Sequence, residues 1–126
     1  MKLSANLGLL WSELPLLDRV YKAKEKNFDA IEFQFPYEVD ANELKKAIDK
    51  INLPIIGINT IKGNVSKGDN GLNAVPSRVQ EARSAIDQAI EYAKVIGSKN
   101  IHFMCGITEQ NHNSLKTLVE NLQYAV

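Results

Sequence analysis

A strand-length apolar run followed by an amphipathic helical pattern occurs four times along the chain, and this repeat limits the fold more than any other feature. The four units begin near residues 2, 28, 54 and 100. Alternating strand and helix patterns are typical of parallel sheets whose strands are joined by right-handed crossovers. We therefore predict an α/β fold of four βα units with parallel strands.

Two architectures are compatible with this repeat, a small doubly wound sheet and a (β/α)8 barrel. A complete barrel needs about 250 residues and eight units. This chain has 126 residues, and it ends on a helical pattern without a stop signal, as a truncated barrel would. We expect about half of a barrel, as a single domain over residues 1–126, with its strands in the order 1-2-3-4.

The helices are predicted from apolar residues spaced three and four positions apart. Ser12 is the expected cap of the first helix, whose first turn would hold Pro15, and Asp40 with Glu43 resembles a capping box. Ser114 is expected to open the last helix. The apolar face of that helix is predicted to contain Leu115, Leu118, Val119 and Leu122.

Each predicted strand has one apolar face and one face with small or polar groups, because side chains alternate between the two faces of a strand. The predicted strands are Lys2–Leu7, Phe28–Phe33, Pro54–Asn59 and Asn100–Cys105. Their polar faces carry Asn6, Glu32, Asn59 and His102, whereas Ile56 and Ile58 fall on the apolar face of the third strand. An inward face that turns polar at the strand ends builds the mouth of a barrel. Scattered polar residues, each satisfied individually, are the alternative.

Glu32 interrupts the most apolar of these strands, and a buried carboxylate is costly unless it has partners. It could act as a general base, or it could pair with a basic or polar group that holds the strand ends in place. His102 could be a ligand or an acid, or simply a core residue. Asn6 and Asn59 could bind a small hydroxy acid or cap loop backbone.

Composition excludes several classes of function. Fifteen basic and fifteen acidic residues balance, so nothing suggests binding to nucleic acid or to a membrane. The single cysteine, Cys105, excludes an internal disulfide framework, and we expect a small buried residue in a cytoplasmic protein. The long glycine-containing stretch Lys62–Ser77 is expected to be functional or disordered. Lys62, Lys67 and Arg78 flank it and could attract a carboxylate substrate or remain solvated.

Several segments together resemble the hydroxypyruvate isomerases, within the larger group of xylose-isomerase-like TIM barrels. They are Ser4–Leu7, Glu13–Arg19, Phe28–Phe33 with Phe35–Tyr37, Gly63, Gly68, Gly71–Arg78, Ala89–Ala93 and Ile101–Gly106. The Phe-Asp-Ala-Ile-Glu segment is shared across the larger group. The loop that ends in Leu-Asn-Ala-Val-Pro-Ser-Arg is more specific to the isomerases.

The resemblance implies the N-terminal half of a barrel that interconverts hydroxypyruvate and tartronate semialdehyde through an enediol. It places the metal ligands and the two proton-transferring glutamates of the family on later strands, so no catalytic residue and no metal ligand is assigned here. A divalent metal is expected in the complete family barrel and none in this chain alone. The alternatives are a sugar isomerase or ketose epimerase of the same group, and a non-catalytic half-barrel module.

Four residues are predicted to bind substrate, namely Asn6, Glu32, Asn59 and His102. The expected ligand is a small hydroxy-carbonyl acid or a sugar. Because half of a barrel leaves its first and last strands unpaired, the expected protein partner is a second copy of the chain or a separate C-terminal half.

Overall fold

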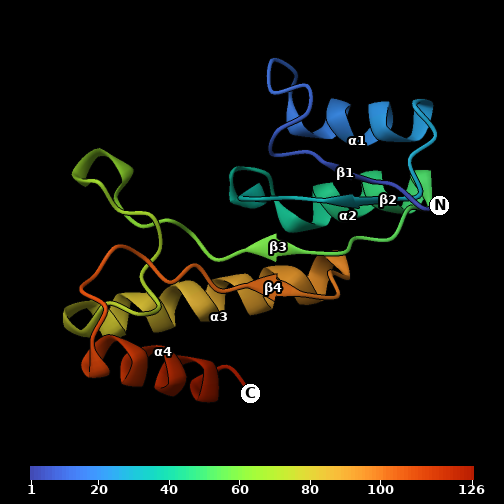
Figure 1. The fold of residues 1–126 in the computed structure, drawn as a ribbon. Helices are drawn as coiled ribbons and strands as arrows, with labels where there is room; N and C mark the ends of the chain where they lie inside the picture. Colours follow the sequence, from blue (N-terminus) through green and yellow to red (C-terminus); the bar gives the residue numbers. More distant parts are fainter. The chain divides into compact units, whose positions relative to one another are not determined.

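The computed structural model describes all 126 residues and shows an α/β fold of four βα units with parallel strands (Figure 1). The strands are β1 (Ser4–Asn6), β2 (Ala30–Glu32), β3 (Ile58–Asn59) and β4 (Ile101–His102). The α-helices are α1 (Leu16–Glu25), α2 (Ala41–Ile51), α3 (Val79–Ile96) and α4 (His112–Tyr124). None of these helices is both long enough and apolar enough to cross a membrane.

The chain forms two compact units. The first unit contains residues 1–59 and 91–101, and the second contains residues 60–90 and 102–126. The prediction of a single domain over residues 1–126 concerns the relation between these units and stays a prediction.

In the first unit, β1 and β2 pair in parallel, with Ala5 opposite Ile31 and Asn6 opposite Glu32. Ala5, Ile31 and the following Phe33 are buried, as the alternation of side chains predicted. Helices α1 and α2 pack against each other and contribute to the same core. The apolar residues of the α2 stripe, Leu44, Ala47, Ile48 and Ile51, are buried within it.

Backbone hydrogen bonds join neighbouring strands in chain order. After the β1–β2 pair, Ile31 N donates to Pro54 O (3.0 Å), and Ile56 N donates to Ile31 O (2.9 Å). Ile58 N then donates to Asn100 O (3.2 Å). These bonds agree with the predicted order 1-2-3-4.

The third strand differs from the prediction of a regular strand over Pro54–Asn59. Ile55 and Ile58 are buried, but Ile56 is 36% exposed, so the side chains do not simply alternate. Ile31 N donates to Pro54 O, but Phe33 N donates to Gly57 O (3.0 Å) and not to Ile56 O, so the third strand has one more residue than β2 between these two bonds. The carbonyl of Ile56 accepts instead from the side-chain amide of Asn100 (2.7 Å). Such a bulge shifts the alternation by one residue, which is why the placement of Ile56 on the apolar face was wrong.

The helix ends confirm some predictions and correct others. Asp40 caps α2, since its Oδ1 accepts from the backbone N–H groups of Asn42 (3.0 Å) and Glu43 (3.1 Å). Helix α1 begins later than expected, with Pro15 as its cap residue, so Ser12 is not its cap. Helix α4 is capped by Asn111, whose side chain accepts from the backbone N–H of Ser114, and not by Ser114 itself.

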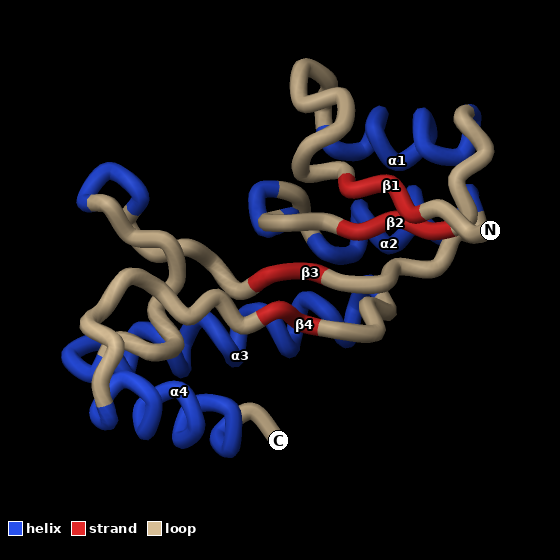
Figure 2. The backbone as a smooth tube through the Cα atoms, in the orientation of Figure 1, coloured by secondary structure: helices blue, strands red, loops and turns tan.

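The second unit is organised around the segment between β3 and α3, which is mostly loop with two short helical turns, Val65–Lys67 and Pro76–Arg78 (Figure 2). This loop is hydrogen-bonded to the chain that follows β4. Leu72 N and Asn73 N both donate to Met104 O (3.1 Å each), and Ala74 N donates to Cys105 O (2.7 Å). The loop is therefore an ordered part of the unit.

Helix α4 buries a polar face, contrary to the prediction. Ser114, Thr117 and Asn121 are buried, whereas the apolar residues expected on the inner face are outward or only partly covered. Leu115 is 61% exposed, and Val119 is 44% exposed. Apolar spacing predicted the helix correctly, but specific polar contacts to the loop decide which face is buried.

Candidate functional site

Asn6 and Glu32 lie directly opposite each other at the carboxyl ends of β1 and β2. Their neighbours Ala5 and Ile31 are buried in the core of the first unit, so both polar side chains belong to the other face of the strands. Asn6 Oδ1 accepts a hydrogen bond from Gly8 N (3.0 Å), which shapes the turn after β1. The local capping role considered for Asn6 is thus present, and its side-chain NH2 remains available.

Glu32 is half-buried, and its carboxylate makes no hydrogen bond or ion pair within the chain. Its backbone carbonyl accepts from Leu7 N (2.9 Å) as part of the pairing with β1. The suggestion that Glu32 pairs with a basic or polar side chain is therefore not what the structure shows. A partly buried carboxylate without a partner at a strand end is suited to accept hydrogen bonds from a ligand.

Asn59 follows Glu32 along the same edge, since its backbone N–H donates to Gln34 O (3.0 Å). Its backbone carbonyl accepts from the hydroxyl of Tyr37, whose ring packs edge-on against Tyr92 (5.2 Å between centroids). Burial raises the pKa of Tyr37 well above its usual range and raises that of Tyr92 to about 12, so both phenols stay neutral donors. These contacts hold the Asn59 backbone in place.

His102 belongs to the second unit and is exposed. Its carbonyl accepts from Thr60 N (3.0 Å), while its imidazole has no partner in the chain. The first unit therefore brings together three of the four predicted substrate-binding residues, and the assignment of all four stays a prediction.

The structure also gives the environments of one cysteine, one histidine and one tryptophan outside the four predicted substrate-binding residues. Cys105 is exposed, which corrects the expectation of a small buried residue, because its strand ends at His102. His112 is exposed at the start of α4. Trp11 packs edge-on against Phe28, with 6.1 Å between the ring centroids.

Arg19 is a residue whose role the sequence reasoning missed. Its guanidinium donates to three backbone carbonyls, those of Leu14 (2.7 Å), Leu7 (2.9 Å) and Ser12 (2.9 Å), and so holds the loop after β1. Arg19 also lines a crevice of about 240 Å³ beside the ends of β1 and β2, together with Gln34. A charged residue within the otherwise apolar stripe of α1 was the available signal.

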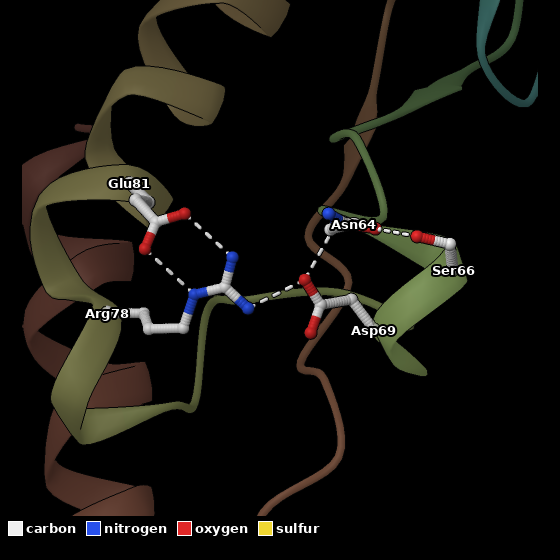
Figure 3. Close-up of polar contacts among 5 residues, drawn as sticks. All are labelled: Asn64, Ser66, Asp69, Arg78 and Glu81. Atoms are coloured by element: carbon white, nitrogen blue, oxygen red, sulfur yellow. Dashed lines mark hydrogen bonds and ion pairs between the residues drawn. The ribbon is translucent and has the colours of Figure 1, made fainter.

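Arg78 closes the long loop onto the start of α3 (Figure 3). Its guanidinium bonds both carboxylate oxygens of Glu81 (2.8 and 2.7 Å) and Oδ2 of Asp69 (2.6 Å), which also accepts from Asn64 N (2.6 Å). Two carboxylates thus compensate the charge of Arg78. The suggestion that Arg78 attracts a carboxylate substrate is therefore wrong.

The hydrogen bond from Arg78 holds the pKa of Asp69 below its usual range, and the same guanidinium lowers the pKa of Glu81. Because the pKa values of Asp69 and Glu81 are lowered in the folded state, their ion pairs with Arg78 stabilise the loop at pH values above the ordinary pKa of a carboxylate. This stabilisation is lost as the pH falls through the lowered values.

We expect Arg78→Gln to make amide exchange in residues 64–71 several-fold faster at neutral pH, because the loop loses both ion pairs. Lowering the pH should produce the same loosening in the unmodified chain and little further change in the variant. Hydrogen–deuterium exchange, expressed as protection factors, measures both effects. Lys94→Gln is the control, since it removes only an exposed pair with Glu91. Equal effects of the two substitutions would contradict the view that the ion pairs of Arg78 with Asp69 and Glu81 hold the loop in place.

The chain does not assemble a donor set for a divalent metal. The structure contains no group of three or more His, Cys, Asp or Glu side chains that could hold an ion. Glu32 is the one carboxylate among the predicted site residues, and Asn6 Oδ1 already accepts from backbone. These residues do not fit the metal that the family resemblance implies for a complete barrel, so no chemical step is assigned to one here.

Comparison with known protein families identifies the family to which this chain belongs. The model of the xylose isomerase-like TIM barrel matches residues 20–126. The chain belongs to this family. Its relatives include hydroxypyruvate isomerases, as the resemblance implied, and 2-oxo-tetronate isomerases, which the sequence analysis did not name.

Two relatives illustrate the similarity. The 2-oxo-tetronate isomerase of Haemophilus influenzae is 36% identical over 98% of this chain and 49% of its own length. The hydroxypyruvate isomerase of Escherichia coli is 37% identical over 99% of this chain and 50% of its own length. The chain thus spans about half the length of the curated relatives it matches.

A solved structure described as an AP endonuclease of family 2 from Brucella melitensis superposes with a TM-score of 0.91 at 34% identity. The match covers 99% of this chain and 50% of the other. The 3-keto-D-glucoside 4-epimerase of Escherichia coli, at 20% identity and a TM-score of 0.69, shows the fold alone. The four βα units therefore correspond to half of known xylose isomerase-like barrels.

Proposed function

We propose that this chain provides the substrate-contacting half of a barrel that interconverts hydroxypyruvate and tartronate semialdehyde. The observation that carries the proposal is the unpaired carboxylate of Glu32, directly opposite Asn6 at the ends of two parallel strands. The names of the relatives support an isomerase of small 2-oxo acids.

The reaction moves one proton between neighbouring carbons. A base removes a proton from C3 of hydroxypyruvate, an enediolate forms across C2 and C3, and a proton returns to C2. The hydroxyl proton on O3 passes to O2, so atoms and charge balance. A carboxylate base and groups that stabilise the enediolate oxygens are the chemical requirements.

The residues of this chain are suited to bind and orient the substrate. Glu32 can accept a hydrogen bond from the C3 hydroxyl, and the side-chain amides of Asn6 and Asn59 can donate to the carbonyl or carboxylate oxygens. The family resemblance assigns proton transfer to glutamates on later strands. Turnover is therefore proposed to need four further βα units, from a separate polypeptide or a longer chain.

Two alternatives remain. A sugar isomerase or epimerase would use the same strand ends for a larger ligand with more hydroxyl groups. A non-catalytic half-barrel would bind neither kind of ligand. Titration with hydroxypyruvate, 2-oxo-tetronate and a ketose separates the three proposals, because each expects a different ligand or none.

We expect Glu32→Gln to weaken hydroxypyruvate binding about tenfold, because it removes a charged acceptor from one hydrogen bond. The measurement is a titration followed by backbone amide shifts, with the largest changes expected at Asn6, Glu32 and Asn59. The chain alone should show no isomerisation above background.

Glu13→Gln is the matched control. Glu13 lies outside the site, and its carboxylate is exposed and has no hydrogen-bond or ion-pair partner. This variant should bind like the unmodified chain. No binding of any of the three ligands, or equal losses in the two variants, would overturn the proposal. Turnover by the chain alone that Glu32→Gln abolishes would instead make Glu32 the base.

A further inference from the structure

Arg19 of α1 is bonded to backbone on both sides of the turn between β1 and α1. Its Nη1 donates to Leu7 O (2.9 Å), directly after β1. Its Nη2 donates to Ser12 O (2.9 Å), and its Nε donates to Leu14 O (2.7 Å), close to the start of the helix. One planar guanidinium thus joins the end of a strand to the start of the helix that follows it.

The turn that Arg19 closes contains a residue in a strained conformation. Trp11 has a φ of +56°, which lies in the left-handed region and is uncommon for a residue with a large side chain. Such a conformation persists only where the surrounding structure holds it. The carbonyls of Ser12 and Leu14, which follow Trp11, are both bonded by Arg19. Arg19 therefore helps to keep the strained turn in one conformation.

The same turn fixes the side chain of Asn6, one of the predicted substrate-binding residues. Asn6 Oδ1 accepts from Gly8 N (3.0 Å), and Asn6 O accepts from Leu10 N (2.9 Å). The direction of the Asn6 amide at the end of β1 therefore depends on where the Gly8 N–H points.

A single peptide group links Arg19 to Asn6. The C=O of Leu7 accepts from the guanidinium, and the N–H of Gly8, in the same peptide group, donates to Asn6 Oδ1. Because the group is planar, rotating it disturbs both hydrogen bonds together. A carbonyl that accepts from a cation also polarises its peptide group, which makes the N–H a stronger donor. Arg19 thus orients and strengthens the bond that holds the Asn6 side chain.

We propose that Arg19 is a positioning residue for ligand binding, which holds the Leu7–Gly8 peptide and so directs the side-chain NH2 of Asn6 towards a ligand at the strand ends. The expected effect on affinity rests on the proposed function, with hydroxypyruvate as the ligand. The expected effect on the Asn6 side chain does not, because the contacts that fix it lie within residues 6–19.

Titration with hydroxypyruvate, followed by backbone amide shifts, tests the effect on affinity. Arg19→Ala should weaken binding about fivefold, because Asn6 no longer donates from a fixed position, while alanine preserves the helix propensity of α1. Arg19→Lys should weaken binding equally although it keeps the charge, because an ammonium lacks the planar fork that reaches three carbonyls. Lys24→Ala removes an exposed charge from the same helix and should bind like the unmodified chain.

A double-mutant cycle tests whether Arg19 acts through Asn6. Asn6→Ser keeps a side-chain oxygen that can accept from Gly8 N, but it removes the amide that would donate to the ligand. In the Asn6→Ser background, Arg19→Ala should weaken binding by less than a further twofold. Fivefold losses in both backgrounds would overturn the proposal. Unchanged binding by Arg19→Lys would also overturn it, because the effect of Arg19 would then be one of charge.

Amide hydrogen exchange without ligand separates this proposal from the proposed function. Arg19→Ala should make exchange at Gly8 and Leu10 about tenfold faster, because both N–H groups are bonded to Asn6. Exchange at Leu44 in α2 should not change, which shows that the variant remains folded. If hydroxypyruvate does not bind to the unmodified chain, the proposed function fails, and exchange at Gly8 still decides whether Arg19 positions Asn6. Unchanged exchange at Gly8 would overturn the proposal.

Discussion

Replacing Gly71 by alanine is expected to lower the free energy of unfolding by about 3 kcal/mol or more, from backbone strain together with steric overlap. Gly71 has a φ of +112°, and a Cβ there would lie 2.6 Å from the carbonyl carbon of Met104. Its neighbour in the contact is Cys105, with which it forms an antiparallel bridge. The atoms that the Cβ would overlap, in Met104 and Gly106, belong to the backbone, so no side chain can move aside.

Gly68→Ala is the matched control, because Gly68 has a φ of +89° and nothing within 4 Å of the added atom. Gly68→Ala should lower the free energy of unfolding by only about 1–2 kcal/mol, which is the cost of placing alanine in the left-handed backbone conformation. Urea unfolding of both variants measures the difference. Equal losses would mean that the loop moves away from Met104 without penalty, and that the close approach does not hold the second unit together.

The repeat of strands and helices could be predicted from sequence because it depends on local periodicity. The positions of Asn6 and Glu32 on one face followed from alternation, since β1 and β2 are regular there. Alternation failed at Ile56, where a bulge inserts a residue and Asn100 provides the missing hydrogen bond. A bulge depends on the neighbouring strand, so a single-strand pattern cannot reveal it.

The roles of charged and polar side chains were harder to predict for a related reason. Arg78 was expected to be solvated or to attract substrate, but it pairs with Asp69, nine positions away, and with Glu81. The freedom of the Glu32 carboxylate likewise depends on which groups the fold brings near it. Sequence therefore identified these residues as candidates and left their partners open.

The inner face of α4 is the other feature that spacing predicted wrongly, and it leads to a second large expected effect. Asn121 is fully buried. Its Nδ2 donates to Asn73 O (3.0 Å), and its Oδ1 accepts from Arg83 Nε (3.4 Å). One side chain thus joins α4 to both the long loop and α3. Asn73 is itself buried, and its Oδ1 already has no hydrogen-bond partner. The loss of one more hydrogen bond here would leave a second buried polar atom unpaired.

Asn121→Leu should lower the free energy of unfolding by about 2–3 kcal/mol, because it leaves the buried Asn73 carbonyl without a donor. Asn113→Leu makes the same change at an exposed position of α4. It should be neutral or slightly stabilising, because leucine has the higher helix propensity. Urea unfolding of the two variants is the measurement. If Asn121→Leu were as stable as Asn113→Leu, apolar packing at this face would suffice, and polar contacts would not be what directs the apolar residues of α4 outward.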